Sequence, residues 1–451
     1  MKLTLILPKC YDRKEDEGDT LVLPPLNLPT IAAITPPHVS VKIVDDRVEE
    51  IDYDAGVDLV GITCITETAG RAYDIASRFR ERGVPVILGG LHPTMMTQDA
   101  LKHADSVLVG EAFGIWDTIL ADVERGRLQK IYRNMQPADL SCIPHPRFDL
   151  LKAGSKYVRG VRLVGATRGC YMRCTFCSTQ EFWEGTFRCR PVGDVIDEIR
   201  ACRKKFIVFV DDDIGGNKKY ARELFEALIP LKIYWVSQTR INLCMDNELL
   251  ALAGKSGCLA LFTGFESVSM DTLKEARKYQ NVVTNYSRAI DNCHRNRICL
   301  EAGFVFGFDT DTRESFQDTL KFILDSKLDS ININVLHPIP GTPAFAQMDK
   351  EERILTYDWN AWAGHERCLY RPRLMSVQDV EAGSAWVVSR IYTWPRIIRR
   401  VARSFRWARW FAPYYLLKQN MSYKRRRADR WGGGYNPALA ASELNREAAP
   451  Q

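Results

Sequence analysis

The chain has 451 residues, of which 46% are apolar and 26% charged, a composition typical of a globular protein with two or three cores. This excludes collagen-like, low-complexity and broadly disordered proteins. No run approaches the ~20 apolar residues of a membrane-spanning helix. The short apolar run Met1–Pro8 ends without a cleavage site, so we expect a cytoplasmic location.

Residues 1–145 alternate between apolar runs and helical patterns such as Glu67–Arg82. Continuous apolar runs are typical of parallel strands that are buried on both faces. We therefore expect a flavodoxin-like α/β domain, with ligands beyond the C-terminal ends of its strands. The expected strands are Leu3–Leu7, Val39–Val44, Leu59–Thr63, Val84–Leu88 and Ser106–Val109.

A proline-containing connector, Pro137–Pro146, is expected to mark a domain boundary. Residues 146–345 then repeat a strand and a helix six times, which favours a partial (β/α)₆ barrel because the closed barrel has eight units. The expected strands are Val161–Ala166, Phe206–Val210, Ile233–Ser237, Leu259–Gly264, Cys299–Gly307 and Ser330–Val335. The expected helices are Val192–Arg203, Lys218–Leu228, Asp246–Ala253, Met270–Lys278, Asn285–Asn296 and Arg313–Asp325.

Three cysteines with the spacing of metal ligands, Cys170, Cys174 and Cys177, follow the first of these barrel strands. Thiolates are ligands for iron–sulfur clusters and for zinc. Three thiolates leave one iron of a [4Fe–4S] cluster open to a small molecule. Structural zinc takes a fourth protein ligand, usually from a second close pair of Cys or His, and no such pair lies nearby. The other ten cysteines are scattered, and we expect them to be buried packing residues.

With an aromatic residue before its last cysteine, this motif resembles that of the radical S-adenosylmethionine (SAM) superfamily. The resemblance implies that the open iron binds the amino and carboxylate groups of SAM. One electron, from a donor such as flavodoxin or ferredoxin, would then cleave SAM to a 5′-deoxyadenosyl radical.

The same resemblance implies that SAM-binding groups lie at the C-terminal ends of the barrel strands. The matching positions are Asp212, Ser237, Arg240 and Glu266, with Phe176 against the adenine. Carboxylates suit a ribose diol or an ammonium group, and arginine suits a carboxylate. The alternatives are a surface ion pair at Arg240 and a structural hydrogen bond at Glu266.

A flavodoxin-like domain followed by such a barrel resembles the cobalamin-dependent radical SAM enzymes, many of which are C-methyltransferases. The resemblance extends over nearly the whole chain and includes Val109-Gly-Glu111 and Arg190-Pro191. It implies that Thr63, Gly89 and Gly90 line the nucleotide tail of cobalamin.

One departure from related cobalamin domains concerns the cobalt ligand. The loop Pro8–Gly18 contains no histidine, so cobalamin would bind without a lower ligand from the protein. His92 could approach the corrin or could form structural hydrogen bonds. A degenerate domain that only packs on the barrel is the alternative to cobalamin binding.

The resemblance implies that one SAM methylates cobalamin and that a second yields the radical, which abstracts hydrogen from the substrate. We therefore expect an enzyme that methylates an unactivated carbon of a small-molecule or lipid-like substrate. One alternative is a radical SAM oxidoreductase or cyclase without methyl transfer, as in anaerobic tetrapyrrole ring closure. Another is an iron–sulfur or corrinoid binding protein without turnover.

Residues 346–451 lack the alternation and are expected to be mainly α-helical. Ser376 and Asp379 predict one helix start, and Pro395 predicts the first turn of another. Between Arg396 and Arg430 there are twelve Lys or Arg and one acidic residue, interspersed with Trp and Tyr. This suits peripheral contact with a membrane. The alternative is a helix that packs on the barrel with a solvated basic face. No RNA-binding signature accompanies the patch, so we expect no nucleic-acid partner.

Overall fold

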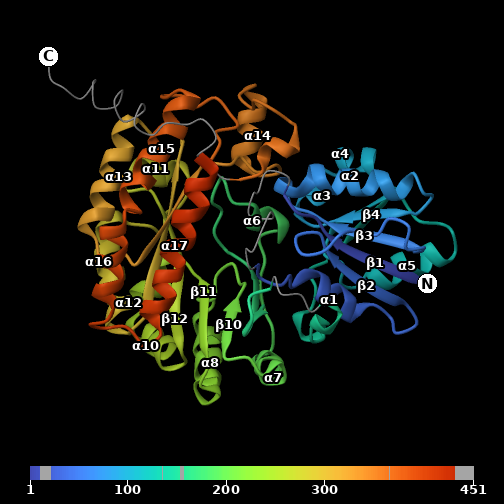
Figure 1. Cartoon of the computed structure of the whole chain (residues 1–451), viewed down its shortest axis with the longest axis horizontal. Coiled ribbons are helices and arrows are strands. Elements are labelled where there is room, and N and C mark those ends of the chain that lie inside the picture. Colours follow the sequence, from blue (N-terminus) through green and yellow to red (C-terminus); the bar gives the residue numbers. More distant parts are fainter. Residues whose placement is uncertain (11–21, 135, 153–156, 365, 432–451) are drawn as a thin grey trace.

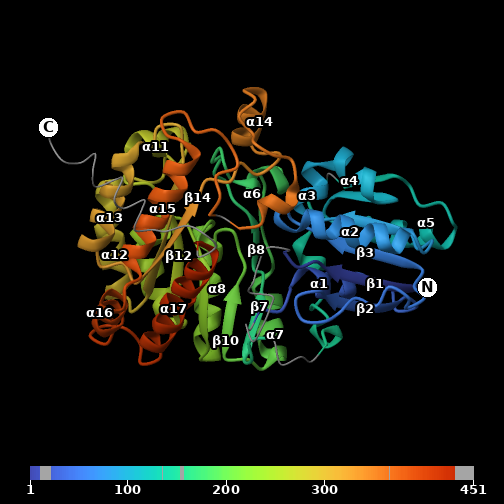
Figure 2. The same cartoon turned by 45° about the horizontal axis from the view of Figure 1, so that its top comes forward.

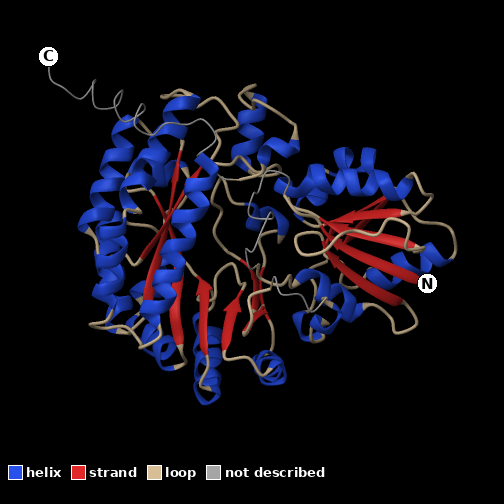
Figure 3. Cartoon of the chain, in the orientation of Figure 1, coloured by secondary structure: helices blue, strands red, loops and turns tan. Residues whose placement is uncertain are grey.

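The computed structural model describes residues 1–10, 22–134, 136–152, 157–364 and 366–431. These residues form two parallel six-stranded sheets with helices packed on them (Figure 1, Figure 3). The α/β class expected from the sequence is confirmed. A two-stranded hairpin is inserted in the chain directly after the first strand of the second sheet.

The first sheet has the strand order β2-β1-β3-β4-β5-β6, which contains the 2-1-3-4-5 order of flavodoxin-like folds. Helices α1 and α5 cover one face of this sheet, and α2 and α4 cover the other. All five predicted strands are present. The edge strand β6 was not predicted, because its short, mixed sequence IYRN gives no continuous apolar run. The elements are β1 Lys2–Leu7, α1 Asn27–Ile34, β2 Ser40–Asp45, β3 Leu59–Thr63, α2 Ala69–Arg80, β4 Val86–Gly89, α3 Leu91–Met95, α4 Thr97–His103, β5 Ser106–Gly110, α5 Trp116–Glu124 and β6 Ile131–Asn134.

The second sheet is hydrogen-bonded in chain order, β7-β10-β11-β12-β13-β14, and its helices pack on the outer face. Each predicted strand and each predicted helix of residues 146–345 has a counterpart within a few residues. The elements are β7 Val161–Val164, α7 Val192–Cys202, β10 Phe206–Phe209, α8 Lys218–Leu228, β11 Tyr234–Gln238, α9 Ile241–Met245, α10 Asn247–Lys255, β12 Cys258–Glu266, α11 Met270–Glu275, α12 Tyr286–Arg295, β13 Cys299–Phe306, α13 Arg313–Asp325 and β14 Ser330–Val335.

A short antiparallel hairpin, β8 Thr167–Gly169 and β9 Phe187–Cys189, was not predicted. The three motif cysteines and helix α6, Ser178–Phe182, lie between its two strands. Gly169 has φ of +93°, and a Cβ there would collide with the carbonyl oxygen of Thr186. Only glycine fits this close approach, which fixes the start of the cysteine loop.

The C-terminal region packs against both sheets. Its helices are α14 Pro343–Lys350, α15 Val377–Ile391, α16 Trp394–Ser404 and α17 Ala412–Trp431, so α14 crosses the boundary placed after residue 345. Trp359 and Trp362 belong to the core of the first sheet, where Trp359 Nε1 donates to Asp99 Oδ2 at 2.8 Å. The predicted cap is confirmed, since Ser376 Oγ accepts from the Asp379 amide at 3.0 Å. None of the described helices is both long and apolar enough to cross a membrane.

The expected burial of the ten cysteines outside the motif holds for seven of them. Cys189 and Cys202 are half-buried, and Cys142 is exposed. Cys142 ends a short 3-10 helix, Leu140–Cys142, in the connector between the sheets, and its side chain is exposed. For this residue the expectation was wrong.

Candidate active site

The three motif cysteines lie on the loop between β8 and α6, just beyond the C-terminal end of β7. Figure 2 shows α6 next to α3 of the first domain. Cys174 is buried, and Cys170 and Cys177 are half-buried. The loop is held by its backbone: the Thr175 amide donates to Ala276 O at 3.1 Å, and the Ala344 amide donates to Thr175 O at 2.9 Å. The thiols therefore lie on a segment fixed between the barrel end and α14.

The loop environment bears on the charge of these thiols. Burial raises the pKa of Cys174 to about 11, while the nearby Lys278 ammonium opposes that shift. Burial also raises the pKa of Cys170, and Arg240 opposes it. Metal binding requires thiolates, and the two cations favour that form. Among the described residues no three such side chains converge on a single metal ion. The donor chemistry of three thiols on one loop suits instead an iron–sulfur cluster, in which each sulfur binds a different iron.

Asp212, a predicted SAM contact, holds both ends of the cysteine loop. Its Oδ2 accepts from the Gly169 amide at 2.9 Å, and its Oδ1 accepts from Thr179 Oγ1 at 3.2 Å. Its neighbour Asp211 is fully buried and accepts from Thr167 Oγ1 at 2.6 Å. These bonds give Asp212 a positioning role for the cysteines.

Ser237 lies near the C-terminal end of β11, Arg240 follows that strand, and both make internal bonds. Ser237 Oγ donates to Phe209 O at 3.2 Å. Arg240 Nε donates to the buried carboxylate of Asp213, which also accepts from Thr239 Oγ1 at 2.9 Å. Arg240 therefore forms an ion pair, but a largely buried one and not the surface pair that was the alternative: the two side chains are 16% and 1% exposed. Both charges act on Cys170.

Glu266 forms an ion pair with Lys278 beside the cysteine loop. Glu266 has φ of +63°, at a register shift of β12, and the absence of a side chain at Gly264 leaves room for the pair. Burial opposes the charge of Lys278, but Glu266 and the thiols of Cys174 and Cys177 raise its pKa overall. The Lys278 Nζ lies 6.0 Å from the centre of the Phe176 ring, so Glu266 and Phe176 share one neighbourhood. Sequence reasoning missed Lys278, which no motif marks.

A cavity of about 460 Å³ lies between the strand ends of the first sheet and the hairpin that carries the cysteine loop. Thr63, Gly89 and Gly90 line it on one side, and Arg168 and Asp212 line it on the other. This volume is typical of ligand pockets. The structure thus brings the predicted cobalamin contacts to one cavity, and places Asp212, Arg240 and Glu266 beside the cysteine loop. Asp212 is common to both.

The wall of this cavity contains an ion cluster that sequence reasoning did not find. Glu111, after β5, accepts from Arg168 Nη1 and, at 2.6 Å, from Arg188 Nη1, and both arginines belong to the hairpin. Burial opposes ionisation of Glu111, but the two arginines and the Ala138 amide lower its pKa overall. The Trp183 ring lies 5.6 and 5.4 Å from the two guanidinium carbons. This cluster links the first sheet to the hairpin.

His92 has the structural role that was weighed against a cofactor role. It is fully buried, with Nδ1 3.1 Å from Thr66 Oγ1 and Nε2 3.0 Å from Tyr73 OH. Burial lowers the pKa of His92 to about 4. The histidine-free loop is described only to Cys10, and its residues 11–18 lie outside the described part of the chain.

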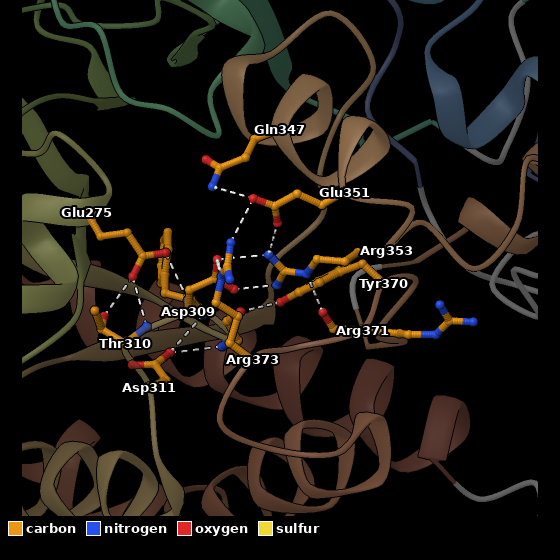
Figure 4. A network of polar contacts seen from close by, with 12 residues as sticks. Glu275, Asp309, Thr310, Asp311, Gln347, Glu351, Arg353, Tyr370, Arg371 and Arg373 are labelled. Atoms are coloured by element: carbon orange, nitrogen blue, oxygen red, sulfur yellow. Dashed lines mark hydrogen bonds and ion pairs between the residues drawn. The ribbon is translucent and has the colours of Figure 1, made fainter.

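A polar network fixes the C-terminal end of β13 (Figure 4). Asp309 accepts from Arg353 Nη1 at 2.9 Å and from Arg373 Nε at 2.8 Å. Tyr370 OH donates to Gly307 O in the same region. Because these arginines and the tyrosine come from the C-terminal region, that region holds the strand end next to Phe308 and Phe176, whose ring centres are 5.6 Å apart.

Comparison with known proteins defines the class. Residues 164–323 match the radical SAM superfamily. The chain is 31% identical over 426 residues to bacteriochlorophyllide d C-12(1)-methyltransferase of Chlorobaculum tepidum, covering 92% of each chain. It is 27% identical over 407 residues to bacteriochlorophyllide d C-8(2)-methyltransferase of the same organism, covering 86% of this chain and 89% of the relative.

The protein therefore belongs to the radical SAM superfamily, whose members use a [4Fe–4S] cluster and SAM. Within it, the chain is a radical SAM enzyme of the group that contains these methyltransferases. Its fold is shared by the cobalamin-dependent SAM radical enzyme OxsB, with a TM-score of 0.69 and 15% identity over 99% of this chain and 75% of the OxsB chain.

Proposed function

We propose that this protein uses cobalamin and a [4Fe–4S] cluster to transfer a methyl group from SAM to an unactivated carbon of a small molecule. One observation supports this most directly: Asp212 lines the cavity between the sheets and also holds both ends of the cysteine loop. The two cofactor sites would share a wall, so a substrate between them would meet both. Such proximity is what reaction between held partners requires.

In this proposal Cys170, Cys174 and Cys177 each bind one iron. The terminal nitrogens of Arg240 bind the SAM carboxylate, because Arg240 engages Asp213 through Nε. Glu266 and Ser237 bind polar groups of SAM, and Phe176 packs against its adenine. Asp212 acts by placing the loop.

Cobalamin, when bound, would supply the methyl carrier. Thr63, Gly89 and Gly90 would face its nucleotide tail, because they are small and line the cavity. Gly90 has φ of +100°, and a Cβ there would lie 2.8 Å from Cys64 O, so the backbone itself forms this wall. We assign cobalamin binding to residues 1–145 and radical formation to residues 146–345. We assign to residues 346–451 the packing that covers both of these domains.

The first substrate class to test is a chlorin-type tetrapyrrole. The reason is the 31% identity, over 92% of the chain, to an enzyme named for bacteriochlorophyllide d. A lipid-like substrate is the second class. The electron donor would be a flavodoxin or a ferredoxin.

The test is anaerobic purification with added cobalamin, followed by quantitation of iron, sulfide and corrinoid. The loaded enzyme is then incubated with reductant, a chlorin substrate and SAM that carries a deuterated methyl group. We expect 5′-deoxyadenosine, S-adenosylhomocysteine and a product that carries the label. Deoxyadenosine without labelled product would favour the cyclase-like alternative. Absence of deoxyadenosine would contradict radical chemistry altogether.

A further inference from the structure

Five bulky side chains stand exposed along α16, the link that follows it and the start of α17. The exposed fractions are 49% for Trp394, 59% for Ile398, 71% for Phe405, 80% for Trp410 and 54% for Tyr414. We call these five residues, with the exposed Arg399, Arg406 and Lys418, the tail face. Such a concentration of exposed aromatic side chains marks an interaction surface rather than an ordinary solvated one.

The helix geometry gathers three of these residues on one side of α16, and Trp410 and Tyr414 extend the exposed aromatic set into the following turn and α17. At 100° per residue, Trp394, Ile398 and Phe405 fall within about 40° of one another. Arg399 and Arg406 follow on the adjacent exposed side. The opposite side of α16 is buried against the protein through Ile397, Arg400 and Ser404. The helix therefore has one face that packs on the protein and one face with apolar and cationic groups that point outward.

Several other cations of the region are engaged within the protein. Arg400 Nη2 donates to Ile391 O at 2.9 Å, and Arg403 Nη2 donates to Leu328 O at 2.9 Å. Arg409 donates to Gly254 O near the end of α10. Cations near the C-terminal carbonyls of helices are stabilising. The packing alternative from the sequence therefore accounts for these residues, but not for the tail face.

The charge of the region indicates its partner. No acidic residue occurs between Glu381 and Asp429. Tryptophan and tyrosine beside arginine are typical of elements that lie at a membrane surface, where the rings enter the headgroup layer and the cations meet anionic lipid. We propose that the tail face binds the surface of an anionic lipid bilayer, as a peripheral contact.

The position of the tail face is compatible with catalysis. Trp410 Nε1 donates to Tyr234 OH at 3.0 Å, at the N-terminal end of β11. The cysteine loop lies at the opposite, C-terminal end of the strands, and α16 lies on the side away from the first sheet (Figure 1, Figure 2). A bilayer at the tail face would leave the cavity between the sheets open.

The test uses the full chain, loaded anaerobically with its cofactors, and flotation with vesicles. Vesicles of phosphatidylcholine with one quarter phosphatidylglycerol are compared with pure phosphatidylcholine, at low and high salt. We expect flotation with the anionic vesicles at low salt and a marked loss at high salt, because screening weakens contacts between exposed charges. Failure to float with anionic vesicles at low salt would overturn the proposal.

Two variants separate the contributions. Arg399→Gln with Arg406→Gln should lower the partition coefficient by roughly tenfold or more, since each cation near anionic lipid contributes appreciably. Phe405→Ser with Ile398→Ser should lower it at both salt concentrations, because apolar insertion is not screened.

The matched control for charge is Lys42→Gln with Lys130→Gln, two exposed lysines of the first domain. This control should float like the wild type. Equal loss in the control and in the arginine variant would overturn the assignment to the tail face. Retention of single-stranded RNA by the wild type, with no vesicle binding, would also overturn it and assign the face to nucleic acid. Flotation needs no substrate and no turnover, so it is independent of the proposed methyl transfer.

Discussion

Replacement of Glu111 by glutamine tests whether one carboxylate holds the first sheet to the cysteine hairpin. The side chain of Glu111 is 9% exposed, and those of its partners Arg168 and Arg188 are 22% and 15% exposed. Glu111→Gln keeps the shape of the side chain but removes the charge that both arginines share. Two guanidinium groups would then remain near each other in a largely buried wall.

The magnitude follows from the geometry. A pair of unit charges about 4 Å apart gains about 4 kcal/mol at an effective dielectric constant of 20. The favourable Coulomb energy of the two Glu111–arginine pairs is offset in part by the desolvation of the three charges and by repulsion between the two arginines. Removal of one partner from a buried pair costs about 3–5 kcal/mol. Because water still reaches both arginines, we expect a loss of about 3 kcal/mol in the free energy of unfolding.

The assay is urea unfolding of the anaerobically purified protein, followed by tryptophan fluorescence. The matched control is Asp54→Asn, which removes the partner of Arg82 in a pair whose side chains are 83% and 38% exposed. That change should cost less than about 1 kcal/mol. A double-mutant cycle of Glu111→Gln with Arg188→Gln should give a coupling above about 1 kcal/mol. If Glu111→Gln costs no more than Asp54→Asn, the reasoning about this cluster is refuted.

Three further predictions concern the cofactor loop, the cavity wall and the core. Cys174→Ala should abolish the incorporation of iron and sulfide after anaerobic reconstitution, whereas the control Cys189→Ala, outside the motif, should retain both. Equal iron content in the two variants would contradict the ligand assignment. Gly90→Ala should reduce corrinoid retention and lower stability by about 1–3 kcal/mol, because φ is +100° and a Cβ would press on the Cys64 carbonyl; unchanged corrinoid content and stability would argue against this wall. His92 is neutral in the fold, with a pKa of about 4, so the unfolded chain gains a proton first as pH falls below about 6.5 and stability drops. The stability advantage of wild type over His92→Asn should shrink by about 2 kcal/mol between pH 7.5 and pH 5.0, and a constant advantage in urea unfolding would show that His92 does not carry this proton linkage.

Local patterns were sufficient for most of the secondary structure. Arg313–Asp325 and Ser330–Val335 were predicted with the bounds that the structure has. The β8–β9 hairpin was missed because strands of three residues carry too little periodicity. The same applies to the short edge strand β6, which is buried only in part.

For the site residues too, local patterns identified some, and the tertiary structure was needed for the rest. The cysteine loop was recognised because the spacing of its three cysteines is local. Asp212 and Arg240 were predicted from a family resemblance, and the structure adds their internal partners Gly169 and Asp213. Each partner lies far along the chain from the residue that it contacts, so no spacing in the sequence identifies the pair.

By itself the sequence determined the two alternating strand–helix regions, the N-terminal cap of α15 and a loop with three cysteines at the spacing of metal ligands. It could do so because apolar periodicity, capping and ligand spacing act between residues close in the chain. Only the tertiary structure decided that Glu111 meets Arg188, that Lys278 meets Glu266, and that Trp359 completes the core of the first sheet. These contacts join residues brought together by burial and charge pairing in three dimensions, and neither force leaves a regular spacing along the chain.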